Sequence, residues 1–246
     1  MTGFDALAGR YDELRPAGTA WSELTDLTLD MLGPCRRLLD IGCGTGRFAV
    51  RAHDSLGGRV WGVDASPEML EQARRQPGSR AIGWRQGEAE KLPFRDGWFD
   101  GAHMHLVVHL LPDRPAALRE AARILAPGGR MVIATFRLEH ITRFYLVPYF
   151  PGIERVDMER FPDPDALAGE LEDSGFASVT VTPFDQQNQL DPQVILDRVR
   201  GRYISTLHLL GEDEYQEGLQ RLEAAMQGRT EPVASTLRWA LVRGVG

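Results

Sequence analysis

The sequence has few of the features that mark secreted, membrane or nucleic-acid-binding proteins. Only two of its 246 residues are cysteines, Cys35 and Cys43, too few for a disulfide framework. No apolar run approaches the roughly 20 residues that span a bilayer, and residues 1–18 lack the pattern of a secretory signal. The 28 basic residues are outnumbered by 35 acidic ones, so a net charge of -7 gives no overall attraction for nucleic acid or anionic membranes. We therefore expect a cytoplasmic protein with neither as a partner.

The composition is that of a globular protein with a full core. Hydrophobic residues make up 43% of the chain and charged residues 26%. The length fits one large α/β domain with a small cap, and no repeat or linker divides residues 1–246. A monomer and a homodimer are both compatible with these features.

The chain is organised around a short apolar run that stops at three alternating glycines, DIGCGTG at residues 40–46. A helical pattern follows directly, so the segment predicts a buried strand, a tight turn and the start of a helix. Glycine permits a positive φ and leaves no Cβ between the turn and a ligand. We expect a ligand to lie against bare backbone here.

The spacing of these glycines differs from two common nucleotide loops. The dinucleotide fingerprint G-x-G-x-x-G has its third glycine where this chain has Arg47, and the Gly-Lys-Ser/Thr of a P-loop does not follow. The next predicted strand, residues 59–64, ends in Asp64. An acid at this place in a nucleotide site accepts hydrogen bonds from the ribose hydroxyls. Capping of the helix that begins at Pro67 is the alternative role for Asp64.

Three segments resemble, in the expected order, motifs of the class I S-adenosylmethionine-dependent methyltransferases, in particular the type 11-like small-molecule enzymes. They are the glycine turn, GEAEKLPF at residues 87–94 and LAPGG at residues 125–129. In the second, Glu88 stands where the family usually has aspartate. The resemblance implies a doubly wound, Rossmann-like α/β fold, with a seven-stranded sheet, an antiparallel last strand and an inserted helical and loop cap.

The resemblance also implies S-adenosylmethionine as cofactor and S-adenosylhomocysteine as product. Glu88 and the amide of Ala89 would contact the adenine, and Tyr11 and Arg15, in an N-terminal segment, would reach the methionine end. A surface position is the alternative for Arg15. The implied cofactor contacts are Tyr11, Arg15, Asp40, Gly42, Cys43, Gly44, Gly46, Asp64, Ala65, Met69, Glu88, Ala89 and His105.

The fourth predicted strand ends near His105, and His109 follows on the next turn. In the family this strand end lies under the reacting methyl, so His105 is the first candidate for a catalytic base and Tyr11 the second. Ordinary packing is the alternative for both histidines. No carboxylate or thiol stands at ligand spacing around them, and a sulfonium needs no Lewis acid, so no metal is predicted.

Two long insertions leave from the carboxyl ends of strands, the edge where such sheets bind ligands. We predict a lid segment and helix at residues 1–36, a cofactor-binding core at 37–136, and cap insertions at 137–161 and 183–232 that form the substrate pocket. Peripheral packing or a dimer contact is the alternative for the insertions.

Aromatic residues in the first insertion suit a planar or apolar acceptor. Arg143, Arg155 and Arg202 would suit a carboxylate if they point inward, whereas the run Arg198, Arg200 and Arg202 is interpreted as a solvated helix face. The sequence predicts in-line methyl transfer to an O, N or C nucleophile of a small molecule. A methyltransferase acting on RNA or protein, and a non-catalytic Rossmann-like cofactor-binding protein, stay open as alternatives.

Overall fold

The computed structural model describes residues 8–246, whose strands form a seven-stranded sheet. Residues 1–7 of the predicted lid segment lie outside the described residues. The strands are β1 (Arg37–Ile41), β2 (Arg59–Asp64), β3 (Gly83–Gln86), β4 (Phe99–His105), β5 (Leu125–Phe136), β6 (Ala177–Leu190) and β7 (Val233–Val245). Their order is β3-β2-β1-β4-β5-β7-β6, with β1 to β5 parallel and β7 antiparallel to both of its neighbours. The predicted fold class is confirmed.

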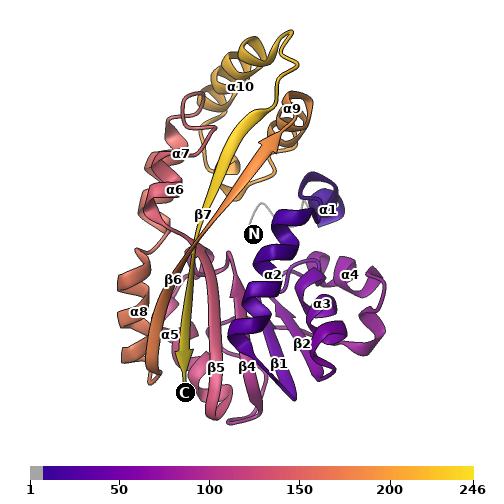
Figure 1. The fold of residues 1–246 in the computed structure, drawn as a ribbon, viewed down its shortest axis with the longest axis vertical. Helices are drawn as coiled ribbons and strands as arrows, with labels where there is room; N and C mark the ends of the chain where they lie inside the picture. Colours follow the sequence, from indigo (N-terminus) through magenta and orange to yellow (C-terminus); the bar gives the residue numbers. More distant parts are fainter. Residues whose placement is uncertain (1–7) are drawn as a thin grey trace.

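Helices cover both faces of this sheet (Figure 1). The α-helices are α1 (Tyr11–Leu14), α2 (Thr19–Leu32), α3 (Arg47–Leu56), α4 (Pro67–Arg75), α5 (Arg114–Ile124), α6 (Leu138–Thr142), α7 (Gly152–Arg160), α8 (Pro164–Asp173), α9 (Pro192–Arg200) and α10 (Glu212–Met226). α2 and α3 pack their apolar sides on one face, and α5 and α8 pack on the other. The parallel strands are therefore buried on both sides, which explains their nearly continuous apolar sequences.

Several helices begin with a polar cap followed by proline. Ser66 precedes α4, and Asp163 and Asp191 precede α8 and α9; in each case the side-chain oxygen accepts a backbone N–H of the first turn. Proline, which has no N–H, occupies a first-turn position that needs no donor. These starts fix where the chain turns away from the sheet.

The sixth strand is longer than predicted. The second cap insertion was predicted to begin at Pro183, whereas β6 continues to Leu190, which lies opposite Val233 of β7. β6 is at the edge of the sheet, where a missing N–H is tolerated. The second insertion therefore begins at residue 191 and not at 183.

In the cap, α9 and α10 are carried on the ends of β6 and β7, which project beyond the parallel strands, and α6 and α7 follow the end of β5 (Figure 1). α7, α9 and α10 share a hydrophobic cluster separate from the two clusters against the sheet, and Leu14 of α1 joins it. The N-terminal segment thus packs against the cap, and together they cover the carboxyl ends of the parallel strands.

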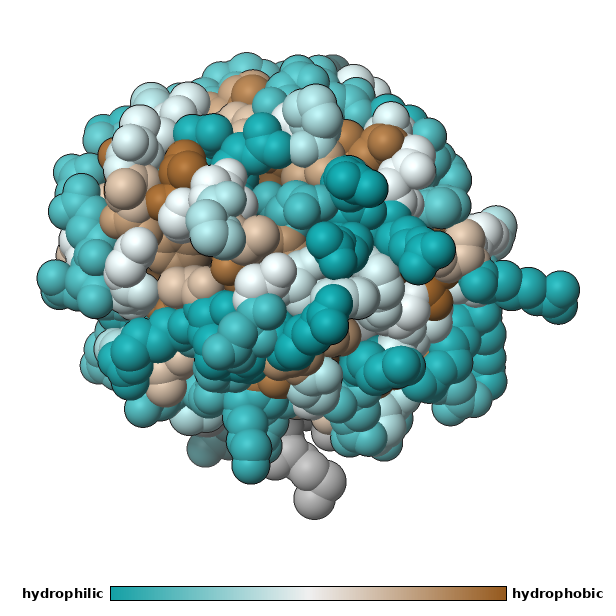
Figure 2. Space-filling model, turned by 90° about the horizontal axis from the view of Figure 1, so that it is seen from below, coloured by the Kyte–Doolittle hydropathy of each residue, from teal (hydrophilic) through white to brown (hydrophobic). Residues whose placement is uncertain are grey.

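The end of the molecule away from the cap is mainly hydrophilic, with smaller hydrophobic areas between (Figure 2). Large hydrophobic side chains that are exposed are Met158, Val194 and Leu209, all in the cap. Within residues 8–246, no helix has both the length and the apolar character needed to cross a bilayer.

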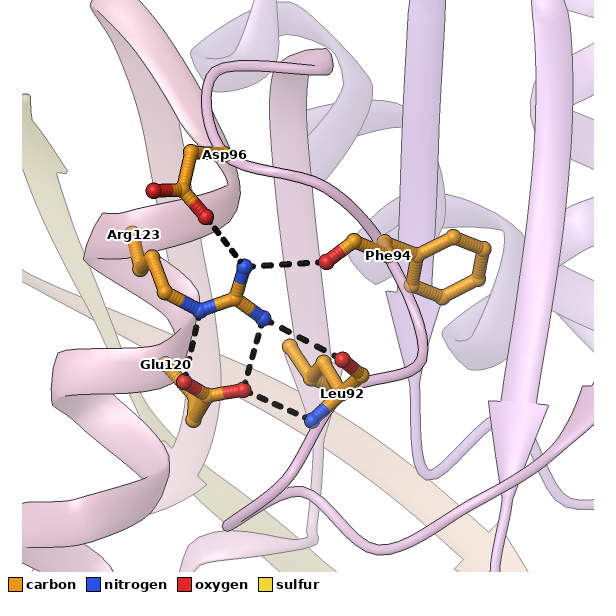
Figure 3. A network of polar contacts seen from close by, with 5 residues as sticks. All are labelled: Leu92, Phe94, Asp96, Glu120 and Arg123. Carbon is orange, nitrogen blue, oxygen red and sulfur yellow. Dashed lines mark hydrogen bonds and ion pairs between the residues drawn. The ribbon is translucent and has the colours of Figure 1, made fainter.

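The loop between β3 and β4 is held against α5 by one arginine (Figure 3). Arg123 donates to Glu120, to Asp96 and to the carbonyl oxygens of Leu92 and Phe94 at 2.6–3.1 Å. Glu120 in turn accepts the backbone N–H of Leu92 at 2.8 Å. The network satisfies loop backbone groups and so fixes a loop whose start reaches the edge where ligands bind.

Replacing Arg123 with methionine should lower the free energy of unfolding by about 1–3 kcal/mol, because loop carbonyls lose charge-assisted donors in a partly exposed setting. Urea denaturation followed by circular dichroism measures the change. Arg119→Met is the control, since Arg119 is exposed on the same helix. Equal midpoints for the two variants would contradict the role of the network.

Candidate functional site

One cavity of about 920 Å³ runs from the carboxyl ends of β1, β2 and β4 into the cap. Its walls come from the glycine turn, the end of β2, the loop after β3, the N-terminal segment and the cap. The volume is near the upper end of the roughly 300–1,000 Å³ usual for small-molecule sites. It therefore has room for two ligands that meet inside it.

The three glycines of the turn have different roles. A Cβ on Gly44 would meet no atom within 4 Å, so this residue presents bare backbone. A Cβ on Gly42 would lie 2.5 Å from the cavity-lining side chain of Val107. A Cβ on Gly46 would lie 2.5 Å from Trp84, so Gly46 permits close packing at the start of α3 and does not line the cavity.

Asp64 ties the glycine turn to the end of β2. Its Oδ2 accepts the N–H of Gly44 at 2.8 Å, and its Oδ1 accepts the N–H of Ser66 at 2.9 Å. Capping of α4 is done by the hydroxyl of Ser66, which accepts the N–H of Met69. The two amides orient the Asp64 carboxylate at the cavity wall.

Most of the predicted cofactor contacts meet in this cavity. Its walls include Tyr11, Arg15, Gly42, Gly44, Asp64, Ala65, Met69, Glu88, Ala89 and His105. Asp40, Cys43 and Gly46 are not among them. The Cys43 sulfur is turned toward Gly62 of β2, where it lies 2.8 Å from the position of a Cβ, so Cys43 packs behind the turn.

Asp40 lies below the turn and pairs with a residue far from it in the sequence, which was not a predicted partner. Its Oδ1 is 3.1 Å from Nδ1 of His103, its neighbour in register on β4, and both side chains are buried. Burial raises the pKa of Asp40 and lowers the pKa of His103 to about 3, so the uncharged form of each is favoured. Asp40 therefore supports the floor of the site from beneath.

The N-terminal segment is fastened to the glycine turn through Asp12. Its carboxylate accepts the hydroxyl of Thr45 at 2.7 Å and the amide of Gln76 at 2.6 Å, and it pairs with Arg47 at 3.1 Å. Arg47 also donates to the backbone carbonyls of Asp12 and Arg15. The residue that breaks the dinucleotide pattern thus holds this segment over the cavity.

Arg15 joins the same segment to the cap. Its Nε and Nη2 donate to the carbonyl oxygen of Tyr203 at 2.8 and 2.6 Å, and its Nη1 donates to the hydroxyl of Tyr11 at 2.8 Å. No acidic side chain within residues 8–246 forms an ion pair with it. Arg15 is therefore a cation of the cavity wall and not a surface residue.

Three cavity-lining histidines are kept uncharged by burial. Burial lowers the pKa of His105 and of His109 to about 3, and the pKa of His140 to about 4. His109 stacks on Phe161 with ring centroids 3.9 Å apart. In the part of the chain that the structure describes, no three His, Cys, Asp or Glu side chains are grouped to hold a metal ion.

Aromatic side chains from strand ends and cap line the other half of the cavity. Phe136 at the end of β5 stacks on Trp239 of β7 at 4.3 Å, and Phe144, Tyr145 and Phe161 lie at the same wall. Only the aromatic residues of the insertion that contains Phe144 and Tyr145 were predicted for the pocket. The contribution of Phe136 and Trp239 depends on the β5–β7 register, which pairs them.

The arginines predicted as carboxylate partners do not line the cavity. Arg143 is exposed, Arg155 pairs with Glu214 at 3.6 Å, and Arg202 pairs with Glu212. Their charges are therefore directed to the surface of the cap.

Arg198, interpreted from the sequence as part of a solvated face, lines the cavity instead. Ile195 and Val199 form the buried side of α9, and position 198 lies three residues after the first and one before the second. Helical spacing places all three on one side, so this pattern was available in the sequence.

This chain is similar in sequence and fold to known proteins. A family model described as a methyltransferase domain matches residues 39–133. The ubiquinone/menaquinone biosynthesis C-methyltransferase UbiE of Methylobacterium nodulans is 33% identical over 72% of this chain and 82% of its own length. The O-methyltransferase resE of Aspergillus sclerotiorum is 37% identical over 42% of this chain and 41% of its own. The solved structure of a protein from an antibiotic biosynthesis pathway of Anabaena variabilis matches this one with a TM-score of 0.74 and 22% identity. The match covers 91% of this chain and 96% of that chain.

The glycine contacts predict different costs for two single-methyl changes. Gly46→Ala should lower the free energy of unfolding by about 2–4 kcal/mol, because backbone strain adds to overlap with Trp84. Gly44→Ala should cost about 1–2 kcal/mol from strain alone, since its Cβ meets no atom. Urea denaturation of both variants measures this difference, and a larger loss for Gly44→Ala would refute the assignment.

Proposed function

The chain belongs to the class I S-adenosylmethionine-dependent methyltransferases that act on small molecules, and we propose that it methylates an oxygen or carbon atom of a planar aromatic acceptor. One observation carries this proposal. A single cavity joins the wall of predicted cofactor contacts to a wall of aromatic side chains, so donor and acceptor would meet inside it.

The residues of the strand edge fit the cofactor. Gly44 offers backbone that no side chain covers, and the Asp64 carboxylate suits the ribose hydroxyls. Met69 and Ala89 suit the adenine, and Arg15, which has no acidic partner within residues 8–246, suits the methionine carboxylate. S-adenosylmethionine, when bound, supplies an electrophilic methyl group on a sulfonium centre.

Uncharged histidines suit a cavity that receives a cation. A protonated His105 would repel a sulfonium strongly in a site that excludes water, and burial prevents that protonation by lowering the pKa of His105 to about 3. At the end of β4, neutral His105 accepts a hydrogen bond from a hydroxyl group of the small molecule that is to be methylated. The proton of this hydroxyl becomes far more acidic as the new O–C bond forms. His105, although a weak base, can therefore take the proton late in the reaction.

Tyr11 fits a positioning role better than that of a base. Its hydroxyl accepts a hydrogen bond from Arg15, and that contact orients the residue that we assign to the methionine carboxylate. Alignment of the acceptor with the methyl group in a dry cavity supplies much of the acceleration.

The relatives support the choice of target atom. By their names, UbiE is a C-methyltransferase and resE an O-methyltransferase. We propose no metal, because a sulfonium is electrophilic without a Lewis acid. We propose the cytoplasm as compartment, since Cys35 and Cys43 are both free. A monomer or a homodimer stays a prediction, and neither RNA nor protein methylation is favoured by the aromatic cavity.

Asp64→Ala should weaken binding of S-adenosylhomocysteine by about 1–3 kcal/mol, because two ribose hydroxyls lose their acceptor. Isothermal titration calorimetry measures the affinity. Asp54→Ala is the control, since Asp54 is exposed on α3 outside the cavity. If both variants bind as the wild type does, the ribose is held elsewhere.

The rate of methyl transfer should be nearly independent of pH between 8 and 5, since a His105 with a pKa of about 3 stays neutral throughout. A histidine with an ordinary pKa near 6.5 would be mostly protonated at pH 5 and would lower kcat/KM by roughly 30-fold. The measurement uses release of S-adenosylhomocysteine with a neutral hydroxyarene that does not ionise in this range. Circular dichroism checks that the fold persists, and an acid limb centred near pH 6.5 would contradict the role of burial.

A further inference from the structure

Arg198 is a cation of the cavity wall that lacks a charged partner. None of its side-chain nitrogens has a hydrogen-bond or ion-pair partner within residues 8–246, and its Nε is buried. Its guanidinium lies 5.9 Å from the ring centroid of Tyr203, at the outer limit of a cation–π contact. Arg202 lies much closer, 3.7 Å, over Tyr215 and also pairs with Glu212. The protein therefore leaves the buried Nε of Arg198 without a hydrogen-bond acceptor.

We propose that Arg198 binds a carboxylate of the methyl acceptor, so that the acceptor is a planar aromatic acid. This inference rests on the proposed function and specifies the substrate class of the same cavity. The acid group would lie in the cap, and the ring would extend along the aromatic wall toward the end of β4.

The other charges near the cap leave room for one negative charge on the ligand. Asp157 lines the cavity but is paired with Arg160 at 2.7 Å and accepts the hydroxyl of Thr206 at 2.8 Å. His109 and His140 are uncharged, because burial lowers the pKa of each well below 7. Arg15, the other cation of the cavity wall without an acidic partner within residues 8–246, is assigned to the methionine carboxylate, so Arg198 is the positive charge left for the methyl acceptor. A carboxylate matches it, whereas a phosphate monoester would bring a charge of about -1.5 to -2.

Two tyrosine hydroxyls beside Arg198 add hydrogen-bond donors to the proposed carboxylate site. Those of Tyr145 and Tyr203 are 2.9 Å apart and line the cavity, and the hydrogen bond between them uses only one of their two protons. Burial raises the pKa of both hydroxyls, so both keep their protons, and the charge of Arg198 acts on each. One O–H is therefore available to a carboxylate oxygen that Arg198 also contacts.

The experiment compares acids with their neutral amides on the full chain saturated with S-adenosylhomocysteine. The probes are 4-hydroxybenzoate against 4-hydroxybenzamide, and 6-hydroxy-2-naphthoate against its amide, titrated by calorimetry. For at least one pair the acid should bind the wild type about tenfold or more tighter than the amide. Arg198→Met should remove that preference and leave amide binding unchanged, and Arg198→Lys should restore part of it.

Arg200→Met is the matched control, because Arg200 lies on the same helix, is exposed and pairs with Glu223 at 2.7 Å. It should keep the preference for acids. Equal binding of acid and amide, no binding of any probe, or a preference that survives Arg198→Met would overturn the proposal. The initial titration with S-adenosylhomocysteine distinguishes failure of the proposed function from failure of the carboxylate site. If S-adenosylhomocysteine does not bind, the proposed function is refuted. If it binds but acids are not preferred over amides, only the carboxylate site is refuted.

Discussion

The bonds from the amides of Gly44 and Ser66 to the Asp64 carboxylate are the contact on which the ligand edge depends. They join the turn after β1 to the chain leaving β2, and they add to the backbone hydrogen bonds that Gly42 and Cys43 donate to the carbonyl oxygen of Val63. The rest of the site is built on that turn. Thr45 lies in the turn and Arg47 follows it at the start of α3. Both bind Asp12, so the glycine turn also positions the N-terminal segment that covers the cavity.

The cavity has two halves that are supported in different ways. The half at the strand edge rests on parallel strands buried on both faces, with the Asp40–His103 pair beneath it. The other half rests on the cap, whose hydrophobic cluster is separate from the core of the sheet. Arg15 links the two, because it lines the cavity from the N-terminal segment and donates to the backbone of Tyr203 in the cap.

Features encoded within a few residues could be predicted from the sequence, and features created by pairing between distant strands could not. The glycine turn, residues 87–94 and the proline-glycine turn before β5 are local patterns, and the family resemblance that they carry implied the fold class. The Asp40–His103 pair and the stacking of Phe136 on Trp239 exist only in the register of the finished sheet. Gly46 has the spacing of a ligand contact but faces Trp84, which no local pattern reveals. Arg198 was predictable from its helical spacing with Ile195 and Val199, but its neighbouring arginines favoured a solvated face.

Residues 191–232 of the cap are attached to the sheet through the projecting ends of β6 and β7, which lie on the other side of β4 and β5 from the strands that carry the glycine turn and Asp64. Residues 191–232, which form the acceptor side of the cavity in the proposed function, take no part in the hydrogen bonds that pair β1 with β2 and β4. Such a layout lets acceptor preference diverge during evolution while donor chemistry is inherited intact, and it makes this segment the natural place to exchange when engineering a new specificity.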